Sequence, residues 1–143
     1  MRTLLAFLAV VIGGCALVQQ PAPVLAPAPA PPAAHAESAA IAGLLDGARA
    51  DAASGRLANA AASLERALRI EPRNPRLWQE LARVRLKQGE YAQAESTAAR
   101  SNSWAGGDST LRAENWRLIA RAREARGDAA GARAALEAAE RQR

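Results

Sequence analysis

Apolar residues beyond residue 40 recur every three or four positions, which is the spacing of amphipathic helices. In the segment before Gly89, Leu77 and Leu81 fall on one helix face. Asn74 and Pro75 predict the start of this helix, because Asn caps free N–H groups and Pro lacks an N–H that would stay unpaired. Gly89 predicts its end, since glycine readily adopts the left-handed conformation found there. No segment in this part of the sequence alternates with a period of two, so we expect no strands.

A glycine followed by a frame of small and apolar residues occurs three times along the chain. Gly55 and Gly89 are 34 residues apart, and Gly127 follows Gly89 by 38 residues. A period in this range is typical of stacked helix pairs, in which each pair buries its apolar face against the next. The three frames consist of Gly55, Leu57, Ala60, Leu64, Ala67, Leu68 and Pro72; of Gly89, Tyr91, Ala94 and Ala98; and of Gly127, Ala129, Ala132, Leu136 and Ala139.

The three units resemble tetratricopeptide repeats, each of which is an antiparallel helix pair. The best matching residues are Trp78, Leu81, Ala82, Gly89, Tyr91 and Ala94 in one unit, and Trp116, Ile119, Ala120, Gly127, Ala132 and Leu136 in the next. The resemblance implies an all-α fold, a short solenoid of about three repeats over residues 41–143, with units at about 41–74, 75–108 and 109–143. It also implies that Trp78 and Trp116 pack in the core. The large residue usual near the end of the first helix is replaced by Asp51, Arg85 and Arg123.

The N-terminus has the form of an export signal. Arg2 supplies a positive start, and the apolar run from Leu4 to Ile12 is too short to cross a bilayer as a permanent helix. The small residues before Cys15 resemble the bacterial lipobox, which implies that residues 1–14 are removed and that Cys15 is lipidated. The alternatives are a free cysteine within an ordinary signal peptide, and cleavage after Ala36.

Residues 15–40 differ in composition from the rest of the chain. Prolines alternate there with Ala and Val, which predicts a disordered tether of polyproline-like character. At about 3.1 Å per residue, such a tether reaches on the order of 75 Å. Ala16 stands where Asp would signal inner-membrane retention in many Gram-negative lipoproteins, so we expect an outer-membrane anchor that faces the periplasm. Cys15 is the only cysteine, and the exported domain is therefore expected to fold without disulfides.

The formal net charge is +5. Lys87 is the only lysine, and all the other positively charged side chains are arginines. In tetratricopeptide repeats the first helix of each pair lines a concave groove. The candidate partner-binding residues on these helices are Arg49, Arg76, Gln79, Arg83, Lys87, Arg117 and Arg121. Arg49, Arg83 and Arg121 occupy the same position before each glycine, and Arg pairs bidentately with carboxylates. One interpretation is a groove for an acidic or C-terminal segment of a protein partner. The other is a solvated face whose arginines pair with nearby Glu residues.

The longer spacing between the second and third glycines indicates an insertion. We place it at Ser101–Asp108, in the connection after the second unit, with Asp108 capping a long helix that runs through Arg126. Trp104 lies within this insertion. It is either a hydrophobic plug over the last helix pair, which we favour, or an exposed anchor for a partner.

Residues that carry catalysis or bind metals do not gather anywhere in the sequence. His35 is the only histidine and lies in the tether, and Cys15 is occupied by the anchor. We therefore expect no enzyme activity, no cofactor and no metal. The high pI raises the possibility of nucleic-acid binding, but the chain has no nucleic-acid motif and an export signal, so we expect no such partner.

A lipidated cysteine, a Pro/Ala-rich tether and a small tetratricopeptide domain together resemble the LpoP family. The stretches Arg100–Asn102 and 113–120 are also similar. Members of that family are outer-membrane lipoproteins that activate a bifunctional class A penicillin-binding protein across the periplasm. The resemblance implies an allosteric activator of peptidoglycan synthesis. The alternative is a pilotin or assembly factor for a pilus, a secretin or an outer-membrane complex.

Overall fold

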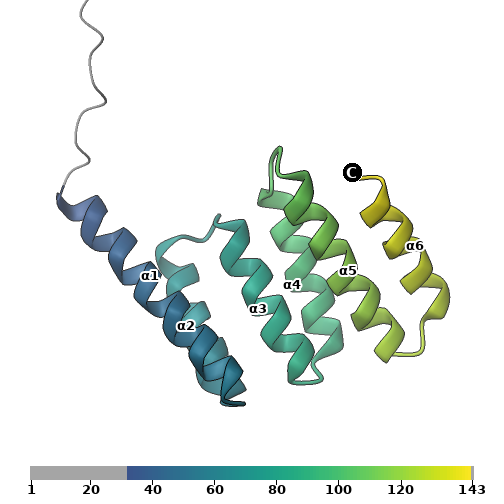
Figure 1. Ribbon diagram of the computed structural model, residues 1–143, viewed down its shortest axis with the longest axis horizontal. Coiled ribbons are helices and arrows are strands. Elements are labelled where there is room, and N and C mark those ends of the chain that lie inside the picture. The colour runs from purple at the N-terminus through teal and green to yellow at the C-terminus, as the bar shows by residue number, and fades with distance from the viewer. Residues whose placement is uncertain (1–31, 143) are drawn as a thin grey trace, which may run out of the picture.

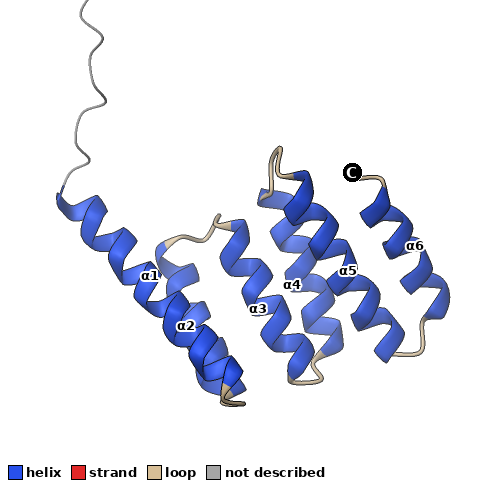
Figure 2. Cartoon of the chain, in the orientation of Figure 1, coloured by secondary structure: helices blue, strands red, loops and turns tan. Residues whose placement is uncertain are grey.

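The computed structural model describes residues 32–142, which form helices joined by short turns and contain no strand (Figures 1 and 2). The predicted signal peptide, Cys15 and the proline-rich part of the predicted tether lie outside the described residues. The all-α prediction is confirmed. The six helices are α1 (Pro32–Ala53), α2 (Leu57–Ile70), α3 (Pro75–Lys87), α4 (Tyr91–Trp104), α5 (Ser109–Ala125) and α6 (Ala129–Glu140). None of these helices is long and apolar enough to cross a membrane.

The helices form three antiparallel pairs that stack side by side in chain order (Figure 1). Each pair packs on the next through its second helix, α2 against α3 and α4 against α5, and α3 also contacts α5. Successive first helices therefore run parallel to one another, as in a short solenoid. This arrangement brings α1, α3 and α5 to one side of the stack, where the groove described below is found.

Local signals in the sequence set the helix ends. The side chain of Asn74 accepts hydrogen bonds from the N–H groups of Arg76 and Leu77 at the start of α3. Asp108 caps α5 in the same way, accepting a 2.9 Å hydrogen bond from the N–H of Leu111. Gly89 has a φ of 77°, a conformation that other residues adopt only at a cost, and Gly55 and Gly127 share it at 76° and 81°. The predicted starts and ends of these helices are confirmed.

The core consists of two clusters in which small residues allow close helix packing. Leu64 and Leu77 lie at the centre of the first cluster, and Ile119 at the centre of the second, each at most 2% exposed. Trp78 packs against the first cluster and Trp116 against the second, as predicted, and each keeps part of its surface in solvent. Alanines that are fully buried fill the positions where the helices approach one another.

The four extra residues of the third unit lie in a helix rather than in a connection. The α4–α5 turn, residues 105–108, has the same length as the α2–α3 turn, residues 71–74, whereas α5 has 17 residues against 13 in α3. The predicted longer connection at 101–108 is therefore wrong. Four residues amount to about one helical turn, so the insertion lengthens α5 without turning its buried face away from the core.

The first helix begins earlier than the sequence predicted. Residues 32–40, placed at the end of the disordered tether, are the first turns of α1. The physical reason is local, because Pro is favoured at the first position of a helix and the following residues are mostly Ala, the best helix former. The predicted domain boundary at residue 41 thus falls inside a helix.

Leu136 is not the core residue that the repeat frame predicts. The residues at the same distance after the earlier turn glycines, Leu64 and Ala98, are 1% and 0% exposed, whereas Leu136 is 50% exposed. The next helix pair covers this position in the first two units. No further helix packs on α6 within residues 32–142, so Leu136 stays in contact with solvent.

Candidate protein-binding groove

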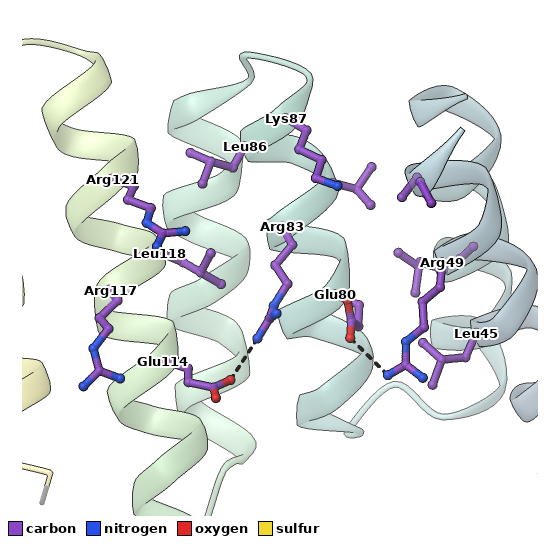
Figure 3. A pocket seen from close by; sticks show the side chains of 15 residues that line it. Leu45, Arg49, Glu80, Arg83, Leu86, Lys87, Glu114, Arg117, Leu118 and Arg121 are labelled. Atoms are coloured by element: carbon purple, nitrogen blue, oxygen red, sulfur yellow. Dashed lines mark hydrogen bonds and ion pairs between the residues drawn. The ribbon is translucent and has the colours of Figure 1, made fainter. Parts of the chain in front are cut away.

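A cleft of about 490 Å³ opens across α1, α3 and α5, with part of α2 at its base (Figure 3). Its floor is apolar and buried, and consists of Ala48, Leu64, Val84 and Leu118. Charged side chains project around this floor from the three first helices. They comprise five cations, Arg49, Arg83, Lys87, Arg117 and Arg121, and two carboxylates, Glu80 and Glu114. An apolar floor with an excess of positive charge around it suits an acidic segment that also carries apolar side chains.

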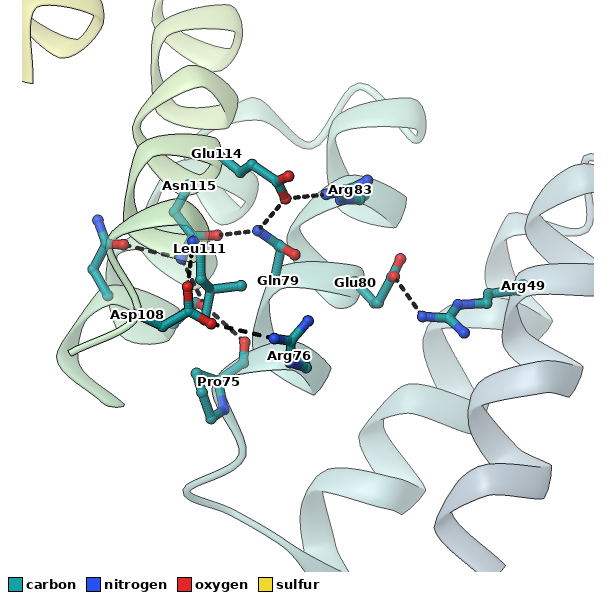
Figure 4. Close-up of polar contacts among 12 residues, drawn as sticks. Arg49, Pro75, Arg76, Gln79, Glu80, Arg83, Asp108, Leu111, Glu114 and Asn115 are labelled. Carbon is teal, nitrogen blue, oxygen red and sulfur yellow. Dashed lines mark hydrogen bonds and ion pairs between the residues drawn. The ribbon is translucent and has the colours of Figure 1, made fainter. Parts of the chain in front are cut away.

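Two of the arginines bridge successive first helices. A guanidinium N–H of Arg49 donates to Glu80 over 3.1 Å, and one of Arg83 donates to Glu114 over 2.8 Å (Figures 3 and 4). For these two arginines, the interpretation that they pair with nearby Glu residues is correct. Both pairs are exposed to solvent, and such pairs contribute only about 0–1 kcal/mol. A carboxylate from a partner can therefore compete with them at little cost.

Part of the positive charge around the groove is not balanced. Lys87 and Arg121 make no ion pair with any residue in the described part of the chain. Arg117 lies 4.0 Å from a carboxylate oxygen of Glu140, at the limit of an ion pair. The predicted row of arginines along the first helices is thus assembled in one groove, with unpaired cations on both α3 and α5.

Two of the predicted groove residues lie elsewhere. Gln79 is 5% exposed, and its amide N–H₂ donates to Asn115 and to Glu114, at 3.1 Å in each case (Figure 4). Arg76 pairs with Asp108 over 3.2 Å at the turn before α5, outside the cleft. These positions of α3 face α5 and the connection before it, so neither side chain lies in the cleft.

A buried polar network, which the sequence reasoning missed, locks α3, α4 and α5 together. Asn115 is 0% exposed, and its amide donates to the Ser101 hydroxyl over 2.7 Å and to Asn102 over 2.9 Å. The Ser101 hydroxyl in turn donates to the carbonyl of Pro75 over 2.7 Å. Because an unpaired buried polar group is costly, this network favours one register between the second and third pairs. The signal in the sequence was an Asn on the apolar face of α5.

Ion pairs between units replace the large residue that the repeat family has near the end of the first helix. Arg85 pairs with Glu65 on α2 and with Glu90 at the start of α4. Arg123 pairs with Glu95 on α4 over 2.7 Å. In both cases the side chain is mostly buried and reaches back to the second helix of the preceding unit. The two arginines thus connect neighbouring pairs on the side away from the groove floor.

Trp104 is exposed, and the interpretation that it plugs the last helix pair is wrong. It is the last residue of α4, 42% exposed, and the guanidinium of Arg73 lies 5.2 Å from its ring centroid. The buried positions here are Ala98, Ser101 and Ala105, and Trp104 lies off that face of the helix. A second cation–π contact joins Arg100 to Trp78, at 5.1 Å, on the same side of the second unit. The described residues contain no cluster of three His, Cys, Asp or Glu side chains that could hold a metal ion.

The stacked helix pairs and the groove across their first helices define a tetratricopeptide-repeat domain, a module for protein interaction. The sequence profile of the tetratricopeptide repeat matches residues 51–113. The solved structure of the globular C-terminal domain of P. aeruginosa LpoP is 50% identical in sequence, with a TM-score of 0.69, and the match covers 70% of this chain and 94% of that chain. The chain belongs to the LpoP-like family of tetratricopeptide-repeat proteins. No curated protein sequence matches the chain significantly.

Proposed function

We propose that the chain is a non-catalytic outer-membrane lipoprotein that activates a class A penicillin-binding protein in peptidoglycan synthesis. The observation that carries the proposal is the groove, whose apolar floor and unpaired Lys87 and Arg121 suit an acidic protein segment. The 50% identity to the LpoP domain supports the choice of partner. In this proposal the partner carries out all the chemistry.

Binding proceeds by exchange of carboxylates in the groove. An acidic segment of the partner places apolar side chains on Leu64, Val84 and Leu118 and its carboxylates against Lys87 and Arg121. It can also displace Glu80 or Glu114 from exposed pairs that are individually weak. Charge complementarity of this kind raises the rate of association and aligns the partner along the groove.

Activation is allosteric in this proposal. A ligand shifts a conformational equilibrium only by its difference in affinity for the two states. The groove therefore binds the active state of the synthase more tightly than the resting state, and the rates of glycan polymerisation and crosslinking rise with occupancy.

The anchor and tether position the domain. Lipidated Cys15 holds the chain at the inner leaflet of the outer membrane, and the proline-rich residues after it extend into the periplasm. Helix α1 begins at Pro32, inside the segment 15–40 that the sequence assigned to the tether.

The proposal is tested with a soluble chain, residues 16–143, added to the purified class A penicillin-binding protein of the same organism. Glycan polymerisation from lipid-linked precursor is followed with time. We expect a several-fold rise in rate that is lost in the double variant Arg83→Glu, Lys87→Glu. The matched control is Arg66→Glu, Arg69→Glu, the same charge change at exposed, unpaired positions of α2 outside the groove. An unchanged rate with the unmodified chain would refute the proposal.

A further inference from the structure

The helices α5 and α6 form the last pair of the stack, and their outer face is open. The corresponding faces of the first two pairs are covered by the next pair. Leu64 of the first pair and Ala98 of the second are buried by the first helix of the following pair. Leu136 occupies the same position in the third pair, and half of its surface is in solvent. A cleft of about 400 Å³ runs between α5 and α6 at this end, with Ala120, Ala132 and Leu136 among its lining. The lining of this open face therefore combines apolar residues with the charged side chains of Arg117, Arg121, Glu124 and Arg133.

The charge on the open face follows the same rule. Inside the stack, the first helix of each later pair places a carboxylate, Glu80 or Glu114, against an arginine on the first helix of the preceding pair. That arginine lies six residues before the turn glycine, at Arg49 and at Arg83, and Arg121 is its equivalent in the third unit. Within residues 32–142, Arg121 meets no carboxylate. Arg133 on α6 also lines the cleft and also makes no ion pair with the described residues.

We infer that the open face of α5 and α6 binds an amphipathic helix of a protein partner. This helix occupies the place that the first helix of a fourth pair would occupy in the stack. This helix lies parallel to α5, with apolar side chains on Leu136 and Ala132 and a carboxylate on Arg121. The inference goes beyond the groove, because Leu136 and Arg133 line only this end cleft and Arg83 and Lys87 line only the groove. Arg121 borders both surfaces.

A helix from another protein fits this face better than α1 of a second copy. In α1, Asp46 lies nine residues before the turn glycine, as Glu80 does in α3. Beside it, however, Gly43 and Gly47 are exposed, and a Cβ added at either position would meet no other side chain. They offer no side chain to cover Leu136, so the open face of α1 lacks the apolar half of the complement.

The probe for this inference is a fluorescent peptide of residues 74–90, the chain's own α3 with both caps, held helical by a staple on its solvent side. It carries Glu80 and the apolar face that α3 presents to the first pair. Fluorescence anisotropy measures its binding to the purified full-length chain in detergent. We expect saturable binding that Leu136→Asp and Arg133→Glu each weaken by at least about tenfold. Arg66→Glu is the charge-matched control on α2 and is expected to bind as the unmodified chain does.

A charge swap identifies the contact with Arg121. A peptide with Glu80→Lys is expected to bind poorly to the unmodified chain and to recover on the Arg121→Glu variant. Thermal unfolding shows whether each variant stays folded, which the exposure of Leu136, Arg121 and Arg133 leads us to expect.

Three results would overturn the inference. They are the absence of saturable binding at millimolar peptide, binding that Leu136→Asp leaves unchanged, and binding that only the groove variant Arg83→Glu reduces. Concentration-dependent self-association that Leu136→Asp abolishes would assign the face to a second copy and would also overturn it. None of these results depends on the identity of the penicillin-binding protein.

Discussion

Single polar side chains decide how the second and third helix pairs fit together. Asn115 sits on the apolar face of α5, where the repeat pattern favours an apolar residue, and is fully buried among hydrogen-bond partners from two other helices. A polar group in such a position restricts the register of the stack, because a shift by one turn would leave it unpaired. The groove depends on this register, because the groove residue Glu114 immediately precedes Asn115 in the chain.

Replacing Asn115 by Ala is expected to lower the free energy of unfolding by about 2 kcal/mol, because it removes three buried or partly buried hydrogen bonds, one each with Gln79, Ser101 and Asn102. Urea denaturation followed by circular dichroism measures this change. Asn102→Ala is the control and should cost less, since Asn102 is only half-buried and contributes one of these bonds. An Asn115→Ala protein as stable as the unmodified chain would contradict the role of the network.

The charged residues of the groove are expected to matter for binding and not for folding. Arg83→Glu should change the free energy of unfolding by no more than about 1 kcal/mol, because its pair with Glu114 is exposed on both sides. By contrast, Arg123→Ala should destabilise the chain by a larger amount, because Arg123 is mostly buried and its partner Glu95 loses its stronger contact. Thermal unfolding of both variants compares them directly. Equal losses of stability would contradict this distinction.

The helices themselves follow from local signals, which is why most of them could be predicted. Asn74, Asp108 and the turn glycines mark helix ends by chemistry that acts within a few residues. The insertion could not be placed, because an extra turn in α5 leaves the same pattern of apolar residues as a longer connection does. Whether Gln79, Trp104 and Leu136 are buried or exposed depends on which helices lie beside them. The spacing of residues along the sequence does not carry this information.

The turn after α3 provides a test at the scale of the element. Gly89→Ala is expected to cost about 1 kcal/mol of unfolding free energy, because its φ of 77° is strained for any residue with a Cβ. Gly43→Ala, within α1, should instead stabilise the chain by up to about 1 kcal/mol, since a Cβ there meets no atom and Ala is the better helix former. Denaturation midpoints of the two variants should shift in opposite directions. A shift of both in the same direction would show that one of the two backbone arguments is wrong.

At the scale of the whole molecule, the chain offers two different surfaces to its surroundings. The groove runs across the three first helices and holds unpaired cations on α3 and α5. The open end of the stack adjoins it, and Arg121 borders both. A partner that places an acidic segment in the groove and a helix on the end would use both surfaces at once, and the two linked contacts would reinforce each other.

The central claim is that the groove binds an acidic segment of a class A penicillin-binding protein, and an affinity measurement tests it most directly. Binding of the soluble chain to the immobilised synthase is measured for the unmodified protein, for Arg83→Glu, Lys87→Glu, and for Arg66→Glu, Arg69→Glu. We predict that the groove variant binds at least about tenfold more weakly, that the control binds normally, and that added salt weakens the binding of the unmodified chain. Equal affinity for all three proteins would contradict the account.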